Sequence, residues 1–258
     1  MIWLFYLLLI SLAAVSLRYN WWRIPISYNH PRILMYHSIN EHKNEKFDKW
    51  RVAPKDFEKH ISWLKKNGFN SYTISELLSL KTLPKKAVCI TFDDGFMDNY
   101  KNAYPILKKY GFKATIYIVP NQINNHWDQK NTSFLSCMLN NEQIIQMCDI
   151  VEFGSHTMSH INLEKLEIKE VVDELKNSKK AVEKITKIEC NSFAYPYGKY
   201  NFALSKICME AGYKNAVTVK RGVYKKGDDK FEIKRIGILG TESFIDFWLK
   251  ITRVRNKL

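Results

Sequence analysis

The sequence predicts an α/β fold in which strands and helices alternate within one domain. Short apolar runs, typical of buried strands, are followed by segments whose apolar residues recur every three or four positions, which is typical of amphipathic helices. No internal repeat or interdomain linker breaks this alternation. The chain has 258 residues, and a single α/β barrel commonly takes about 250. We therefore expect a parallel sheet or a barrel, with its functional groups at the carboxyl ends of the strands.

The predicted strands are short apolar segments, several of which end at a histidine, a glycine or paired aspartates. In chain order they cover residues 31–39, 85–95, 113–120, 150–160, 191–198, 213–219 and 232–239. The fourth, "IVEFGSHTMSH", runs from a strand into a turn. Residues 121–141 are polar with scattered aromatics and predict a long loop, which in a compact domain is often functional or mobile.

The predicted helices combine an apolar face with a capping or stop signal. In residues 53–69, Phe57, Ile61 and Leu64 recur at helical spacing, and Gly68 lies where the helix would end. Further helices are expected at residues 73–80, with Ser75 as a possible N-cap, and at residues 97–112, 163–185 and 201–212.

The first 17 residues carry no charge and are followed by Arg18, Arg23 and several aromatics. This pattern predicts a transmembrane anchor or uncleaved signal over residues 1–23, with membrane lipids as partners, followed by the α/β domain over residues 24–258. A cleaved signal peptide and a buried core helix are the alternatives. Positive residues just after the apolar run favour this domain on the cytoplasmic face, with the extracytoplasmic side as the alternative.

The formal net charge of +14 is compatible with an acidic partner such as an anionic lipid or a phosphorylated substrate. The lysines are dispersed and no dense basic block with interleaved aromatics occurs, so we expect no nucleic acid partner. The five cysteines form no CxxC pair, which favours a reducing compartment or buried free thiols.

Three predicted strand ends carry groups able to do chemistry: His37, the pair Asp93 and Asp94, and His156 with His160. Two histidines four residues apart share one face of a helical turn, and one carboxylate would complete a three-ligand metal site. A divalent cation would also offset the repulsion between the adjacent aspartates, if one ligates it and the other stays free. Taken alone, however, "DDG" is compatible with an ordinary turn that caps the next helix.

The motifs "TFDDG" (91–95), "SHTMSH" (155–160) and "FAYPYG" (193–198) resemble the first three motifs of the polysaccharide deacetylases, carbohydrate esterase family 4. The resemblance covers residues 32–238. It implies a distorted (β/α) barrel and metal-dependent removal of an acetyl group from a sugar. It further implies Asp93 as general base and Asp94, His156 and His160 as ligands, most often of zinc. Pro196 and Tyr197 would line the acetyl pocket, with the Tyr197 N–H holding the oxyanion.

The sequence departs from the common family pattern in two places. The third motif lacks the arginine that braces the base in many members, so the partner of Asp93 is open, with Arg235 as a candidate. No histidine follows His160 to serve as the acid. An amine leaving group needs a proton donor, and His37 at an early strand end suits this role, unless it is a hydrogen-bonded core residue. This placement resembles the circularly permuted branch that includes the poly-N-acetylglucosamine deacetylases.

Other candidates are less favoured. His30, His42, His60 and His126 lie in polar or helix-surface contexts. Trp127, in the long loop, could form a sugar-stacking wall or belong to a mobile insertion.

We therefore expect a metal-dependent hydrolase that removes the N-acetyl group from an acetylated amino sugar and releases acetate. Its substrate would be a cell-surface polysaccharide or a lipid-linked glycan precursor. The alternatives are a noncatalytic saccharide-binding relative and a magnesium-dependent phosphohydrolase.

Overall fold

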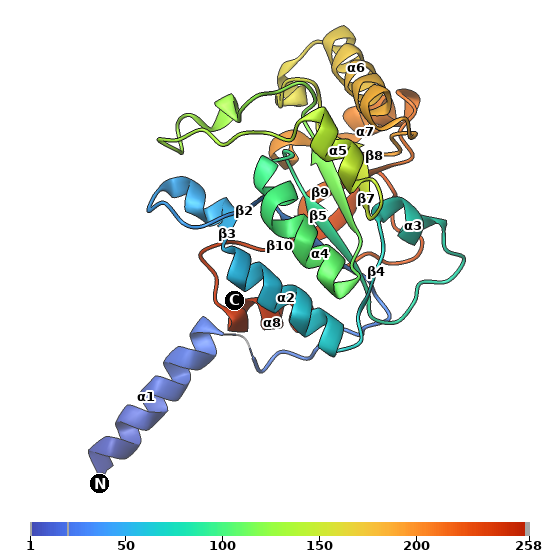
Figure 1. The fold of residues 1–258 in the computed structure, drawn as a ribbon. Coiled ribbons are helices and arrows are strands. Elements are labelled where there is room, and N and C mark those ends of the chain that lie inside the picture. The colour runs from blue at the N-terminus through green and yellow to red at the C-terminus, as the bar shows by residue number, and fades with distance from the viewer. Residues whose placement is uncertain (1, 20, 256–258) are drawn as a thin grey trace.

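The computed structural model describes residues 2–19 and 21–255 (Figure 1). Within them, seven parallel strands close into a barrel in the order β1, β10, β9, β8, β7, β6, β5 and back to β1. The barrel strands are β1 (Arg32–Tyr36), β5 (Ala87–Phe92), β6 (Ala114–Ile118), β7 (Val151–Ser155), β8 (Ser192–Ala194), β9 (Asn215–Arg221) and β10 (Ile233–Gly237). The predicted α/β barrel is therefore confirmed.

Three shorter strands lie outside the ring. The strand β4 (Asn70–Ser71) pairs with the start of β5. The strands β2 (Ser38–Ile39) and β3 (Arg51–Val52) form a small parallel sheet next to the carboxyl end of β1.

Helices surround the barrel (Figure 1). They are α2 (Pro54–Lys66), α3 (Ile74–Ser79), α4 (Tyr104–Tyr110), α5 (Asn141–Met147), α6 (Ile168–Thr186), α7 (Phe202–Glu210) and α8 (Phe244–Arg253). The longest, α6, buries Val171, Leu175 and Val182 at helical spacing, which is why it covers the barrel with one face.

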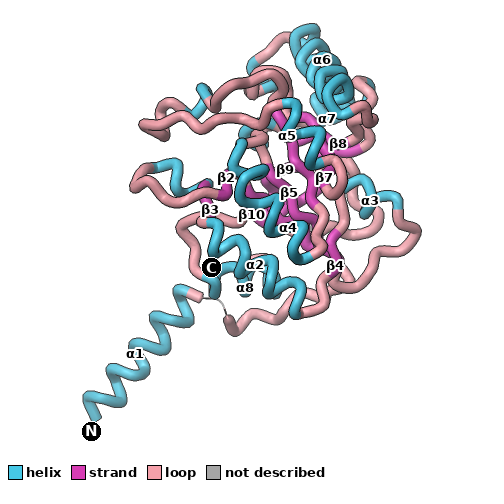
Figure 2. The backbone as a smooth tube through the Cα atoms, viewed as in Figure 1, coloured by secondary structure: helices cyan, strands magenta, loops and turns pink. Residues whose placement is uncertain are grey.

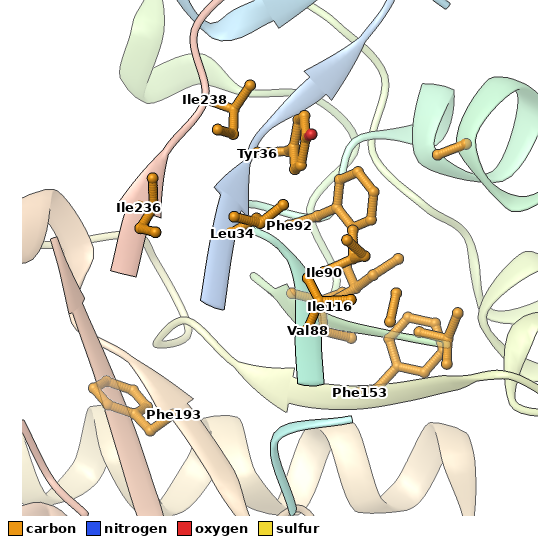
Figure 3. Packing of buried hydrophobic residues seen from close by; sticks show 14 of the residues in the cluster. Leu34, Tyr36, Val88, Ile90, Phe92, Ile116, Phe153, Phe193, Ile236 and Ile238 are labelled. Atoms are coloured by element: carbon orange, nitrogen blue, oxygen red, sulfur yellow. The ribbon is translucent and has the colours of Figure 1, made fainter. Parts of the chain in front are cut away.

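The core has two layers because successive residues of a strand point to opposite faces. In β1, Ile33 belongs to a cluster inside the barrel together with residues of α3, whereas Leu34 belongs to the cluster between the strands and the surrounding helices. Figure 3 shows the outer cluster, with Leu34, Ile90 and Ile116 side by side. Burial of both strand faces explains why the strands read as continuous apolar runs.

Several local predictions need correction. The N-cap of α3 is Thr73, whose side chain accepts a hydrogen bond from Glu76 N at 3.2 Å, and not Ser75. The helix predicted at residues 97–112 begins as a π-helical segment, Asn99–Ala103, before α4. The helices α5 and α8 were not predicted.

His60 is buried and not on the helix surface, because α8 packs on α2. Its ring stacks on Phe247 with centroids 3.9 Å apart, and burial lowers its pKa to about 3.

The amino-terminal segment forms α1 (Ile2–Arg18), which extends away from the barrel (Figure 1). Within residues 2–19 and 21–255, no helix is both long and apolar enough to cross a membrane. The predicted transmembrane helix is therefore not supported. Arg18 forms an ion pair with Asp246 of α8 at 2.9 Å, which ties the end of α1 to the domain.

Candidate active site

A cavity of about 470 Å³ is lined by side chains from all seven barrel strands or from the segments that follow them. His37 follows β1, Asp93 and Asp94 follow β5, His156 and His160 follow β7, Tyr197 follows β8, and Val219 and Arg221 belong to β9. All these residues lie toward the carboxyl ends of parallel strands, which meet at one end of a barrel.

Asp94, His156 and His160 are buried, and their ligand-type atoms lie within 4.8 Å of one another. His156 Nε2 is 3.4 Å and His160 Nε2 is 3.1 Å from the same oxygen, Asp94 Oδ1. Two imidazoles and one carboxylate converging in this way form the donor set of a three-ligand metal site with room for a further ligand.

The segment that carries the two histidines is a loop and not the helical turn expected from their spacing. Thr157 and His160 have φ values of 67° and 54°, in the left-handed region. The loop therefore turns back sharply, which brings His160 to the same carboxylate as His156.

The chain turns equally sharply at the end of β5. Asp94 and Gly95 have φ values of 73° and 84°. A Cβ at Gly95 would lie 2.7 Å from Ile118 Cγ2, so this position admits only glycine without rearrangement. The turn separates the two aspartates, because Asp94 is directed to the histidines and Asp93 to Arg235.

The histidine ring atoms fit a metal site. Ala194 O lies 2.7 Å from His156 Nδ1 and would accept its proton, which leaves Nε2 free to ligate. His160 Nδ1 is buried without a hydrogen-bond partner among the described residues, and its ring stacks on Trp127 with centroids 4.5 Å apart.

Asp93 is clamped by Arg235 of β10. Arg235 Nη1 and Nη2 donate to Asp93 Oδ1 and Oδ2 at 2.6 and 2.7 Å, and Arg235 Nε donates to Thr218 O at 2.9 Å. Burial opposes ionisation of Asp93, but the guanidinium outweighs it and holds the pKa of the carboxyl below its ordinary value. The partner of Asp93 that the sequence left open is therefore Arg235.

His37 lies in the same cavity, with its ring 4.5 Å from that of Trp50. Two residues that follow "TFDDG" hold the backbone around His37 in place. Asn99 Nδ2 donates to His37 O at 2.8 Å, and Asp98 Oδ2 accepts from Ser38 Oγ at 2.6 Å. His37 Nδ1 is buried and has no hydrogen-bond partner among the described residues. Burial lowers the pKa of His37, and Asp94 and Asp93 oppose this shift.

Pro196 and Tyr197 lie in the short 3-10 turn Pro196–Gly198. Tyr197 has a φ of 57° and lines the cavity, with its ring edge-on to His160 at 4.7 Å, whereas Pro196 is buried behind the lining.

The long loop after β6 is drawn in pink in Figure 2 and contributes the wall that carries Trp127. An isolated β-bridge joins Asn124 to Cys137 within the loop. A second bridge, between Phe96 and Met138, and a hydrogen bond from Phe47 N to Asn131 O at 3.1 Å tie the loop to the domain.

Several lining residues were not singled out from the sequence, among them Lys49, Trp50, Asp128 and Arg221. Burial and the nearby Asp94 raise the pKa of Asp128 to about 7. Nothing local in the sequence marks these positions, because each reaches the cavity only through the closure of the barrel and its loops.

Comparison with known proteins finds similarity over most of the chain. The family model for polysaccharide deacetylase matches residues 80–216. The Bacillus subtilis (strain 168) protein YxkH, assigned by name to the polysaccharide deacetylases, is 34% identical over 211 residues, which cover 80% of this chain and 70% of that protein. The poly-beta-1,6-N-acetyl-D-glucosamine N-deacetylase of Staphylococcus aureus (strain MRSA252) is 31% identical over 217 residues, with 79% and 71% covered.

Two solved structures are similar over most of the chain. A polysaccharide deacetylase from Bacillus cereus superposes with a TM-score of 0.75 at 28% identity, covering 86% of this chain and 69% of that chain. The Streptococcus pyogenes deacetylase PplD in complex with acetate superposes with a TM-score of 0.73 at 28% identity, covering 89% and 99%.

Proposed function

Because this chain belongs to the polysaccharide deacetylase family, we propose that it hydrolyses the N-acetyl group of an amino sugar in a polysaccharide and releases acetate. The observation that carries the proposal is the convergence, in one cavity, of a carboxylate with two histidines, a second carboxylate clamped by an arginine, and a third histidine. This set contains a metal site, a base and an acid, which is what hydrolysis of an amide requires.

Asp94, His156 and His160 would hold a divalent metal, and two imidazoles with one carboxylate suit zinc. The bound metal supplies Lewis-acid chemistry, since it lowers the pKa of water and polarises the acetamide oxygen. Ala194 O orients His156 from behind, and Trp127 does the same for the ring of His160.

Asp93 would take the proton from the attacking water. The fork of Arg235 fixes the carboxylate in one orientation and keeps it ionised, so that it is ready to accept a proton at neutral pH. Both oxygens already accept from Arg235, but each retains a second lone pair for the incoming proton.

His37 would donate a proton to the departing sugar nitrogen. Its place among the lining residues of the cavity would let it exchange a proton there. The lowered pKa makes the imidazolium a stronger donor and reduces the protonated fraction at neutral pH.

The turn at Pro196 and Tyr197 would bind the acetyl group. The left-handed conformation of Tyr197 turns the backbone next to the histidine pair, where its N–H would hold the developing oxyanion.

The experiment is to load the purified protein with zinc and measure acetate released from a panel of N-acetylated substrates. The panel contains β-1,6-linked and β-1,4-linked N-acetylglucosamine oligomers, O-acetylated sugars and lipid-linked amino sugars. We expect release from at least one N-acetylated glycan. Saccharide binding without acetate release in the presence of metal would instead indicate a noncatalytic relative.

We further propose that α1 attaches the protein to a lipid bilayer, with the catalytic domain on the cytoplasmic face. The side chains of residues 2–15 are exposed and uncharged, and Trp21 and Trp22 are exposed after them. Flotation with lipid vesicles should recover the full chain but not a chain lacking residues 2–18. A compartment-sensitive reporter at the carboxyl terminus tests the side, and a reporter active only outside the cytoplasm would overturn the orientation.

A further inference from the structure

We propose that the cavity selects glycans in which the N-acetylated amino sugar carries or adjoins an anionic group, a phosphate or a carboxylate, with Lys49 and Arg221 as the residues that bind it. This inference rests on the proposed deacetylase function and names its substrate class. It follows from the balance of charge among the side chains that line the cavity.

Lys49 and Arg221 line the cavity from two different elements. Lys49 belongs to the 3-10 segment Lys46–Trp50, and Arg221 is the last residue of β9. Both residues are exposed, and neither forms an ion pair with any acidic residue in the described part of the chain.

Two cationic residues close to them in sequence do form ion pairs. Lys220, which precedes Arg221, forms an ion pair with Glu232 at 3.1 Å. Arg51, close to Lys49 in sequence, is paired with Glu45 and Asp48 at 2.9 and 2.5 Å. These two neighbours therefore have acidic partners within the protein, whereas Lys49 and Arg221 keep their charge available to a ligand in the cavity.

The acidic groups of the cavity do not supply the missing countercharge. Asp93 is neutralised by Arg235, and Asp94 belongs to the proposed metal site. Asp128 Oδ2 accepts a hydrogen bond from Asn125 Nδ2 at 3.0 Å, and Asp128 forms no ion pair with Lys49 or Arg221. The third cationic lining residue, Lys250, is already bound by Glu242 at 2.5 Å and by Gly237 O at 2.6 Å. The uncompensated charge of the cavity is positive.

The position of Lys49 suggests how a sugar would present its anionic group. Lys49 Nζ lies 4.9 Å from the centre of the Trp50 ring, and that ring is 4.5 Å from His37. The ammonium lies over the face of the Trp50 ring, so a sugar bound beside Trp50 would lie close to both the ammonium and the proposed acid. A phosphate or carboxylate on that sugar or the next one would be within reach of Lys49.

The experiment compares Lys49→Met and Arg221→Met with the matched controls Lys46→Met and Lys220→Met, whose cations do not line the cavity. Each zinc-loaded full chain is assayed for acetate release from three oligosaccharides of equal length. One is neutral, one bears a lactyl carboxylate on an amino sugar, and one bears a phosphate. The two charged substrates distinguish the two sources of negative charge.

For the wild-type protein we expect a higher kcat/KM on at least one charged substrate than on the neutral one, with a preference that declines as salt rises from about 0.05 to 0.5 M. Lys49→Met and Arg221→Met should each raise KM for that substrate roughly 3- to 10-fold, with a smaller change in kcat and on the neutral substrate. The control variants should behave like wild type.

Equal losses on charged and neutral substrates, or a wild-type preference for the neutral one, would overturn the inference while leaving the deacetylase proposal intact. Absence of acetate release from all three and from the wider panel would instead refute the deacetylase proposal itself.

Discussion

Arg235 and Asp93 are separated by 142 residues in sequence, yet their side chains meet in a buried bidentate ion pair with N–O distances of 2.6 and 2.7 Å. The pair joins β10 to the end of β5, the two strands that flank β1 in the barrel. Arg235 Nη1 also donates to Thr91 Oγ1 at 3.1 Å. A buried carboxylate that is held in this way has one orientation and one charge state, as a general base requires.

Arg235→Met should lower turnover by a factor of about 10² or more, because Asp93 loses its orientation and its ionised state. It should also reduce the free energy of unfolding by roughly 3 to 5 kcal/mol, since it leaves a buried charge unpaired. Arg235→Lys keeps the positive charge but loses the bidentate geometry, so its turnover and stability should lie between those of wild type and Arg235→Met. Kinetics, zinc content and urea unfolding measure these effects, and full turnover in Arg235→Met would contradict the assignment of Asp93 as base.

Asp93→Asn should retain the metal and lose turnover by a factor of about 10² to 10⁴, because the amide cannot accept the proton. His156→Ala should lose both metal and turnover, since it removes a proposed ligand. Metal analysis after gel filtration, together with acetate release, separates the two cases. An Asp93→Asn variant as active as wild type on a good substrate would exclude this role of Asp93.

The loss of turnover in His37→Gln should depend on the leaving group of the substrate. An amine needs a proton as the carbon–nitrogen bond breaks, so we expect a loss of about 10² or more on an N-acetylated sugar. An aryl acetate departs as a stable phenolate, and its hydrolysis should fall much less. Parallel kinetics on the two substrates test this, and equal losses on both would assign His37 a structural or binding role.

Removal of metal with a chelator should abolish acetate release, and added zinc should restore it. Because the proposed ligands come from two strand ends, zinc should also stabilise the fold, by about 2.7 kcal/mol at a free concentration of 100 times Kd. Asp93→Asn should show this stabilisation, and His160→Ala should not. Thermal unfolding with and without zinc provides the readout, and activity that persists after complete chelation would rule out a metal-dependent reaction.

His60 should make the fold sensitive to acid independently of the cavity. Its pKa of about 3 lies below the ordinary value of 6.5, so its contribution to stability is complete above about pH 6.5 and is lost as pH falls towards 3. Between pH 7 and 4.5 the wild type should lose roughly 2 to 3 kcal/mol more than His60→Phe, which keeps the stack on Phe247 without a titrating group.

Urea unfolding of the two proteins across this range measures the difference. Replacement of the exposed His126 by Gln is the control and should leave the wild-type pH dependence unchanged. Parallel pH profiles for wild type and His60→Phe would show that His60 is not the group responsible.

The sequence by itself determined the strand and helix alternation, the family, and the candidate residues His37, Asp93, Asp94, His156 and His160. These predictions rest on local patterns, because a strand end, a turn or a short motif consists of residues adjacent in sequence. The motifs "TFDDG" and "SHTMSH" follow two parallel strands of the barrel. Because parallel barrel strands place their carboxyl ends together, the alternation of strands and helices already implies that these motifs lie close in space.

The tertiary structure decided what depends on distant segments. Arg235 becomes the partner of Asp93 only when β10 closes the ring against β1, and His60 is buried only because α8 packs over α2. Left-handed residues, and not a helical turn, bring His156 and His160 to one carboxylate. Each of these contacts forms only when the chain folds. The spacing of neighbouring residues in the sequence therefore does not predict them.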